Sequence, residues 1–240
     1  MRILLLGDVC GPAGMKIIKL KLRKIIKEKK IDFTIANGEN AAENGKGITK
    51  NNFEELVESG VDVITSGNHI WDQKEILEVI ENEKNLIRPA NLLEGQPGNG
   101  YGIYEIKNKK IAVINLIGNV FMKKSQDLFS YTEKIIKKIK LKKDADFIII
   151  DIHGETTSEK MALGYFLDGK VTTVVGTSTI SGKKLFCVSI GSGIPNLFTN
   201  NTSFSLHSVN FNKLPSFIFG KRNFVLDNFR LFVILRTSIS

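Results

Sequence analysis

Acidic, amide and imidazole side chains follow three apolar runs of this sequence, each beside a glycine. The three polar clusters are Gly7-Asp8, Gly38-Glu39-Asn40 and Gly67-Asn68-His69. If each apolar run is a strand, the clusters lie at strand ends, where ligands of open α/β sheets usually bind. The three clusters could therefore converge on one ion or substrate.

A fourth cluster, Ile152-His153-Gly154, ends the apolar run 145–151. Together the clusters offer carboxylates, amides and imidazoles, a set that suits iron, manganese or zinc. A carboxylate shared by two ions is the usual bridge in a two-metal site that hydrolyses phosphate esters, and Glu39 is the candidate bridge. His69, next to Asn68, could protonate a leaving oxygen or hold a phosphoryl oxygen.

Each of these residues also has a purely structural interpretation. Asp8 could cap the following helix, Asn68 could be a turn residue, and His69 or His153 could be hydrogen-bonded core groups. Repetition of the pattern favours chemistry, because two of the three histidines in the chain stand at strand ends beside glycine. The third, His207, has no motif around it and is interpreted as a surface or structural residue.

The apolar periodicity predicts strands that alternate with helices, which favours parallel pairing through right-handed crossovers. The hairpin predicted at 101–116, with its turn at 107–109, departs from a plain doubly wound pattern and indicates a second sheet. A glycine-rich turn is expected at 8–14, helix caps at Thr49 and Asp72, no regular element at 191–212, and a closing antiparallel pair at 217–219 and 224–235. The expected strands are 2–7, 32–36, 61–65, 101–106, 110–116, 145–151, 171–175 and 184–190, and the expected helices 15–28, 51–58, 73–81, 129–139 and 157–167.

Composition limits the class of protein. The chain has 240 residues and 42% hydrophobic content, which is enough for one domain, expected to span 1–240. No apolar run is long enough to cross a membrane, and the first strand leaves no room for a signal peptide, so a cytoplasmic protein is expected. Two cysteines, Cys10 and Cys187, are too few for a disulfide framework and are expected to be buried free thiols.

A net charge of +9 invites an RNA-binding interpretation. However, the lysines of 16–30 and 134–143 alternate with Ile and Leu at helical spacing, as on the solvated face of an amphipathic helix. The spacing thus favours solvated helix faces, with attraction of an anionic substrate as the lesser alternative and RNA as a further partner supported by charge alone. The sequence also leaves open whether the chain forms a homo-oligomer.

The four clusters belong to longer stretches, which are Gly7-Asp8, 37–42, 67–72, 88–91, 100–102, 151–160 and 162–165. At these residues the chain resembles the YmdB-like branch of the calcineurin-type metallophosphoesterases. The most specific part is Gly-Glu-Asn-Ala-Ala at 38–42 combined with Gly-Asn-His-Ile-Trp at 67–71. The resemblance runs nearly continuously from Met1 to about Gly176 and fades afterwards.

The resemblance implies an α/β fold of two mixed sheets packed face to face, with helices outside, in four αββα layers. It also implies a dinuclear site, commonly of iron, with manganese or zinc as alternatives, that hydrolyses phosphodiesters including 2′,3′-cyclic nucleotides. Asp8 and Glu39 would hold one metal, with Asn40 nearby. Glu39, Asn68 and His153 would hold the second, and His69 would be the proton donor.

The chain departs from this family at one motif. Where the family carries Gly-Thr-His-Thr-His, with one histidine for each metal, this chain has Gly176-Thr177-Ser178-Thr179-Ile180, followed by a shorter loop. Loss of both imidazoles should weaken metal binding, because even changes outside the ligand set cost about 10- to 100-fold in affinity. Two hypotheses follow: a working metal-dependent phosphodiesterase, or a degenerate relative that binds nucleotide or phosphate, or regulates through interaction.

Overall fold

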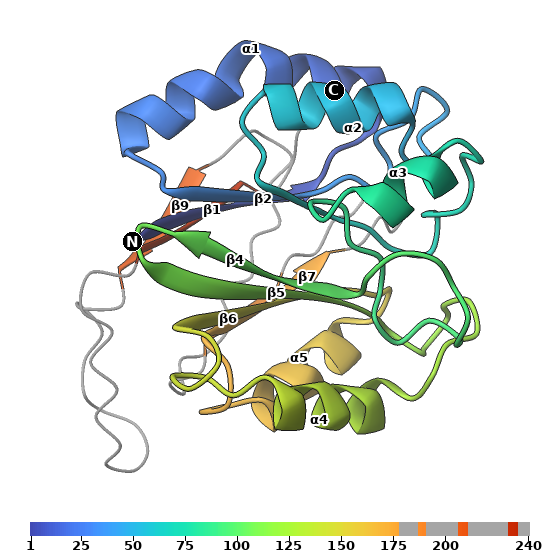
Figure 1. Ribbon diagram of the computed structural model, residues 1–240, viewed down its shortest axis with the longest axis vertical. Coiled ribbons are helices and arrows are strands. Elements are labelled where there is room, and N and C mark those ends of the chain that lie inside the picture. Colours follow the sequence, from blue (N-terminus) through green and yellow to red (C-terminus); the bar gives the residue numbers. More distant parts are fainter. Residues whose placement is uncertain (178–186, 191–205, 211–229, 235–240) are drawn as a thin grey trace.

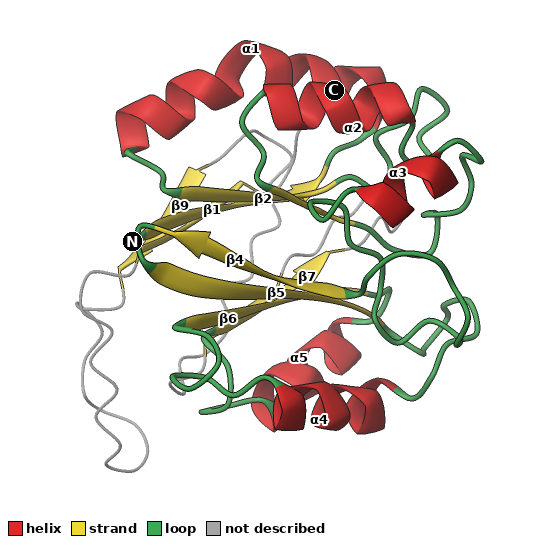
Figure 2. Ribbon diagram, in the orientation of Figure 1, coloured by secondary structure: helices red, strands yellow, loops and turns green. Residues whose placement is uncertain are grey.

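The computed structural model describes residues 1–177, 187–190, 206–210 and 230–234. Two mixed β-sheets pack face to face, and helices cover both outer faces, so that the molecule has four αββα layers (Figure 1, Figure 2). The predicted fold class is confirmed. The strands are β1 (Arg2–Asp8), β2 (Phe33–Asn37), β3 (Val63–Thr65), β4 (Tyr101–Ile106), β5 (Lys109–Ile117), β6 (Phe147–His153), β7 (Thr173–Thr177), β8 (Cys187–Ile190), β9 (Leu206–Asn210) and β10 (Arg230–Ile234). The helices are α1 (Gly11–Lys29), α2 (Lys50–Glu58), α3 (Ile76–Asn82), α4 (Leu128–Lys138) and α5 (Thr157–Phe166).

Each sheet has a parallel centre, with antiparallel pairing at one edge of the first sheet and at both edges of the second. The first sheet has the order β3-β2-β1-β10-β9, and the second has the order β4-β5-β6-β7-β8. Pairing is antiparallel for β10 with β9, β4 with β5, and β7 with β8, and parallel elsewhere. The hairpin at 101–116 thus starts the second sheet, as the sequence predicts.

Apolar side chains fill all three spaces between the layers. One cluster lies between the first sheet and α1, α2 and α3, and another between the second sheet and α4 and α5. The middle cluster joins the two sheets and includes Ile3, Phe33, Val63 and Ile149. Because side chains alternate between the faces of a strand, each inner strand contributes residues to two of these clusters.

The inner faces of the strands change from apolar to polar towards the carboxyl ends. In β6, Phe147 and Ile149 belong to the middle cluster, whereas Asp151 and His153 continue the same face as polar residues. In β2 the same face passes from Ile35 to Asn37. The two sheets therefore enclose an apolar middle and a buried polar edge.

Several sequence-based expectations for local structure are wrong. Helix α1 already begins at Gly11, so residues 8–14 are not all turn, and Leu20, expected inside, is 69% exposed. Asp72 is not a helix cap, because α3 begins at Ile76 with Glu75 as its N-cap. By contrast, Thr49 caps α2 through a hydrogen bond from the backbone N–H of Asn52, as predicted.

The closing strands also differ from the prediction. β10 does pair with an antiparallel neighbour, but that neighbour is β9, in a segment for which the sequence predicts no element. Residues 217–219 and 224–229 of the predicted pair lie outside the described residues, as do 184–186 of the predicted strand that contains β8. Cys10 carries a thiol, as expected, but is only partly buried, and the side chain of Cys187 lies outside the description. None of the helices described has the length and apolar character needed to span a membrane.

Candidate functional site

Residues from four strand ends and both sheets meet at one edge of the molecule. Asp8 is the last residue of β1 and His153 the last of β6, whereas Glu39 and Asn40 follow β2 and Gly67 follows β3. This edge is the right-hand side of Figure 1, where the long loops gather opposite the N-terminus. The predicted convergence of the polar clusters is therefore seen in the fold.

Glu39 and His153 form the centre of the cluster. The Glu39 Oε2 atom lies 2.5 Å from His153 Nε2, and both side chains are almost completely buried. The other carboxylate oxygen, Oε1, accepts a hydrogen bond of 3.2 Å from the backbone N–H of His69. A Cβ atom at Gly67 would collide with both the Glu39 carboxylate and the His153 ring, so glycine is required there.

Asp8 joins this centre through an irregularity in β1. Its pairing with β2 shifts between Leu6 and Asp8, so that Asp8 aligns with Asn37. Such a shift redirects a side chain relative to plain alternation. The Asp8 carboxylate accepts a hydrogen bond of 3.2 Å from Asn40 Nδ2, which places the two predicted ligands side by side.

A buried hydrogen-bond network holds the His153 ring in place. Thr177 Oγ1 donates to Asp151 Oδ1 at 2.9 Å, and the same hydroxyl lies 3.2 Å from His153 Nδ1. Because a hydroxyl has one proton to donate, Thr177 accepts from Nδ1–H, which leaves Nε2 directed at Glu39. Orientation of a metal-binding histidine through its second nitrogen is common in metal sites.

Asp151 is the hub of this network. Its Oδ2 atom accepts hydrogen bonds from Thr65 Oγ1 at 2.5 Å and Asn37 Nδ2 at 3.1 Å, in addition to the bond from Thr177. Burial raises the pKa of Asp151, and these three donors only partly offset that effect. The network thus links β2, β3, β6 and β7 across the two sheets.

The acidic groups around His153 set the pKa of its imidazole. Burial lowers the pKa of its imidazole, but the adjacent Glu39 carboxylate outweighs this effect. Together with Asp8 and Asp151, Glu39 raises the pKa of His153 to about 9.

Four further residues, Asn37, Thr65, Asp151 and Thr177, belong to the site. The sequence analysis gave none of them a role, although all but Thr65 stand in the motif stretches that it quotes. A signal was present for two of them. Asp151 precedes His153 by two positions, so both point to the same face of β6, and Thr177 is the register partner of His153 in β7. The contacts of Asp151 with Asn37 and Thr65 join positions 114 and 86 residues apart in the chain and have no local signature.

His69 lies on the exposed rim of the centre. Its Nδ1 atom is 2.5 Å from Asp72 Oδ2, and the two side chains are 24% and 28% exposed. Lys123 lies 3.5 Å from Asp72 Oδ1 and donates at 2.9 Å to the backbone carbonyl of Asn68. Burial raises the pKa of Asp72, but the hydrogen bond from His69 and the charge of Lys123 outweigh it and lower the pKa.

For the remaining predicted residues, the structure describes no side-chain contact with the centre. Asn68 directly follows Gly67, and the contact described for it uses its backbone carbonyl rather than its amide. Ser178 and Ile180, which replace the histidines of the resembled motif, lie outside the described residues. His207 belongs to β9, and its side chain lies outside the description as well.

The donor atoms of the centre suit a divalent cation, but they do not form a complete metal site. Glu39 and His153 direct an oxygen and a nitrogen at one another beside the space left by Gly67. Nevertheless, within the ranges that the structure describes, no three His, Cys, Asp or Glu side chains form a group that could hold a metal ion. A cation here would also need the amides of Asn40 and Asn68, water, or groups beyond those ranges.

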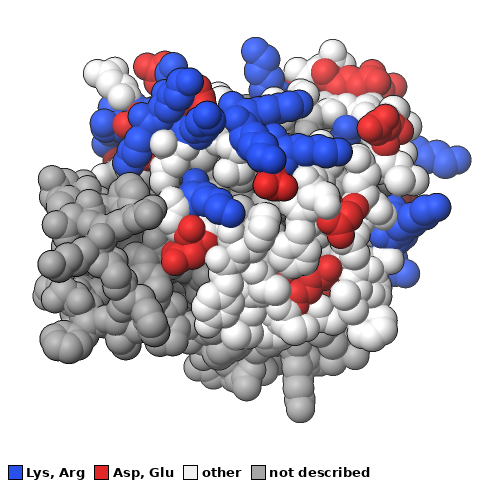
Figure 3. Space-filling model, turned by 90° about the horizontal axis from the view of Figure 1, so that it is seen from below, with Lys and Arg blue, Asp and Glu red and all other residues white. Residues whose placement is uncertain are grey.

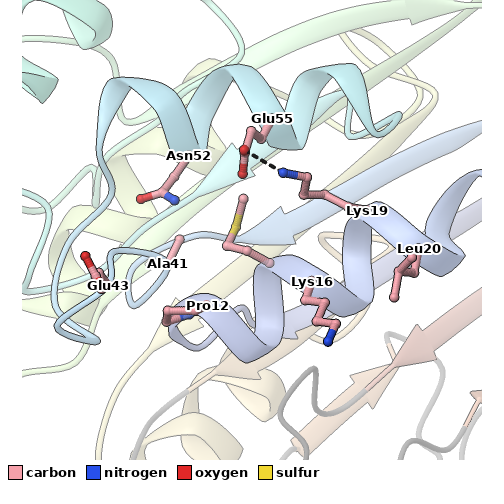
Figure 4. Close-up of a pocket in the computed structure, with 9 residues that line it drawn as sticks. Pro12, Lys16, Lys19, Leu20, Ala41, Glu43, Asn52 and Glu55 are labelled. Atoms are coloured by element: carbon pink, nitrogen blue, oxygen red, sulfur yellow. Dashed lines mark hydrogen bonds and ion pairs between the residues drawn. The ribbon is translucent and has the colours of Figure 1, made fainter.

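A groove of about 390 Å³ lies elsewhere, between α1, α2 and the loop after β2 (Figure 4). Lys19 pairs with Glu55 across it at 2.7 Å. The groove belongs to the helical layer and contains none of the predicted ligands. Its lining residues are Pro12, Met15, Lys16, Lys19, Leu20, Ala41, Glu43, Asn52 and Glu55.

Basic side chains gather on the surface seen in Figure 3, beside several acidic ones. In α4, Lys134, Lys137 and Lys138 are exposed, and Lys137 pairs with Glu133 at 3.1 Å. In α1 the lysines likewise lie outside, opposite the buried Ile17, Ile18 and Leu22. The interpretation of these runs as solvated faces of amphipathic helices is confirmed.

Comparison with known proteins gives consistent matches. The family described as YmdB-like protein matches residues 4–181. A 2′,3′-cyclic-nucleotide 2′-phosphodiesterase of Bacillus subtilis is 46% identical over 179 residues, which cover 75% of this chain and 67% of that protein.

Two solved structures are also similar. One is a novel phosphatase from Mycoplasma pneumoniae, with 41% identity and a TM-score of 0.67, covering 73% of this chain and 63% of that one. The other is a hypothetical protein from Thermus thermophilus, with 29% identity and a TM-score of 0.69, covering 86% and 90%. The chain thus spans about two thirds of the length of the curated relatives, 67% and 64% for two of them.

Proposed function

Because this chain belongs to the YmdB-like protein family, we propose that it is a metal-dependent phosphodiesterase acting on phosphodiesters such as 2′,3′-cyclic nucleotides. The observation that carries the proposal is the buried Glu39–His153 pair at the meeting point of four strand ends. A buried carboxylate and imidazole, 0% and 1% exposed as side chains, are costly to desolvate and are typical of functional centres.

In the proposed site, Asp8 and Glu39 would hold one cation with Asn40 nearby, and Glu39, Asn68 and His153 would hold a second. Bound cations would supply a nucleophilic hydroxide and neutralise charge on the phosphoryl oxygens. Iron is the expected metal, with manganese or zinc as alternatives. The Thr177–Asp151 network would keep Nε2 of His153 directed at the centre, and Gly67 would leave the space beside it free.

His69 would deliver the proton to the leaving oxygen. Asp72 occupies its Nδ1 atom, so Nε2 is the nitrogen left for a substrate. Its partial exposure fits this task, since a proton donor must reach the substrate and exchange with water. Lys123, beside Asp72 and the Asn68 carbonyl, would keep the rim in position.

A comparison of two substrates tests the role of His69. For His69→Ala we expect kcat for 2′,3′-cyclic AMP to fall by about 10²- to 10⁴-fold, the usual contribution of a positioned acid. Hydrolysis of bis-p-nitrophenyl phosphate should fall much less, because p-nitrophenolate leaves without a proton. Equal losses with both substrates would contradict the assignment of His69 as the acid.

Metal content separates the two hypotheses for the chain as a whole. Protein purified without chelator should contain divalent metal by elemental analysis and turn over substrate with added manganese or iron, and Glu39→Gln should abolish both properties. Near-zero metal and no turnover in any divalent ion would favour a degenerate binding protein. In that case Ser178→His with Ile180→His should restore activity if only the two late ligands are lost.

A further inference from the structure

Phe121 presents an aromatic ring to solvent beside the candidate site. Its side chain is 88% exposed, more than any other large hydrophobic residue in the described part of the chain. Its backbone lies in the left-handed region, with φ of 60°, which is unfavourable for a bulky residue. Strained residues of this kind persist where the surrounding structure holds them, and they cluster at functional sites.

The loop that carries Phe121 is attached to the site on both sides of the ring. Before it, the backbone N–H of Gly118 donates at 2.8 Å to the carbonyl of His153. After it, Lys123 donates at 2.9 Å to the carbonyl of Asn68. Phe121 follows Gly118 by three residues, so the Cα atoms of the two residues are at most about 10 Å apart. The backbone of Phe121 therefore lies near the end of β6, which carries His153.

Hydrogen bonds and packing fix the loop on both sides of Phe121. Glu159 accepts hydrogen bonds from the backbone N–H groups of Asn119 at 2.8 Å and Val120 at 3.4 Å. The Asn119 amide donates to Ser125 Oγ at 2.8 Å, and the next residue after Phe121, Met122, packs against the apolar cluster of the first sheet. With both neighbours of Phe121 fixed, the backbone keeps its ring outside instead of burying it.

We propose that Phe121 is a stacking platform for the nucleobase of a nucleotide substrate or product. The inference rests on the proposed function, because the phosphate of the same nucleotide would lie at the Glu39–His153 centre. Every base has a π-face, so a single aromatic ring selects nucleotides over simple phosphate esters without selecting one base. Stacking on Phe121 would thus account for a preference of the site for nucleotides over phosphate esters that lack a base.

Equilibrium binding tests the proposal without turnover. Calorimetric titration of the full chain, in added manganese, compares 3′-AMP with glycerol 2-phosphate, which is also a phosphate ester of a secondary alcohol but lacks a base. We expect the wild type to bind 3′-AMP more tightly, and Phe121→Ala to lose about tenfold in that affinity while glycerol 2-phosphate is unaffected. Phe121→Trp should keep the preference.

The matched control is Tyr165→Ala, which removes another exposed aromatic ring, 70% exposed, near the end of α5 and away from the carboxyl ends of the strands. It should bind both compounds as the wild type does. Equal affinity of Phe121→Ala and wild type for 3′-AMP would overturn the proposal, as would a wild type without preference for the base. Base preference that depends on Phe121 in a protein without turnover would keep the platform and reject the phosphodiesterase.

Discussion

The inner face of β6 contains two regions of opposite character within seven residues. Phe147 and Ile149 lie in the apolar middle between the sheets, and Asp151 and His153 lie in the polar edge. All four are buried, at 8%, 0%, 4% and 1% exposure. Both pairs are therefore buried, but only the polar pair needs hydrogen-bond partners to offset its removal from water.

The apolar half is stabilised by removal from water alone, whereas the polar half needs specific partners. Asp151 accepts hydrogen bonds from three side chains, and His153 is held between Glu39 and Thr177. A buried polar group without such partners costs about 1–3 kcal/mol. The polar edge therefore tolerates little change, and it is at this edge that directed donor atoms for catalysis are available.

The largest effect is expected from a substitution at the polar edge that adds a single carbon atom. Gly67→Ala would push a Cβ into the Glu39 carboxylate and the His153 ring. We expect turnover to fall by about 10³-fold, more than the roughly 10- to 100-fold that outer partners of a metal ligand usually cost, and the metal bound per chain to fall as well. Steady-state kinetics with elemental analysis measures this.

Gly154→Ala is the control for that substitution. Gly154 adjoins His153, but a Cβ there would make only ordinary contacts, the nearest at 3.6 Å to Gly118 Cα. This variant should remain active. An active Gly67→Ala protein would show that the centre does not depend on the close approach of the β3 loop.

The next effect compares the two halves of β6 directly. Asp151→Ala removes the acceptor of three buried donors, and we expect it to lower the free energy of unfolding by about 3 kcal/mol or more and to reduce turnover. Ile149→Val, two residues earlier on the same face, should cost only about 1 kcal/mol and leave kcat unchanged. Urea denaturation and kinetics measure both, and equal effects would remove the distinction between the halves.

The smallest effect concerns a polar group at the margin of the apolar middle. Tyr104 packs against that cluster and donates a hydrogen bond of 2.7 Å to the carbonyl of Lys84. Burial raises the pKa of Tyr104 to about 12, above the ordinary value of 10.0. Since the folded protein binds this proton more tightly, the contribution to stability is complete below about pH 10 and is lost as the pH rises towards 12.

Wild type should therefore lose about 2 kcal/mol more stability than Tyr104→Phe between about pH 9 and pH 12. Urea denaturation of both proteins across this range measures the difference in their free energies of unfolding. Other groups that titrate at alkaline pH are the same in both proteins, so their contributions cancel. Parallel curves for the two proteins would show that the Tyr104 hydroxyl is effectively exposed.

Much of the fold could be predicted from the sequence because its signals are local. Apolar runs and helical periodicity placed strands and helices, and the hairpin at 101–116 indicated the second sheet. Glycine-flanked polar residues marked the strand ends that meet at the site. Asp72 was misassigned because its partner, the His69 ring, competes with the capping role that its position suggested.

The sequence by itself determined which chemical groups stand at the strand ends and, through its resemblance to a known family, how the layers are arranged. Only the tertiary structure decided how those groups are held. Thr65 and Asp151 are 86 positions apart, and Asn37 and Thr177 are 140 apart, so their bonds exist only because two sheets face one another. Likewise, the exposure of Phe121 follows from the anchoring of its neighbours to Glu159 and to the core, which no local pattern encodes.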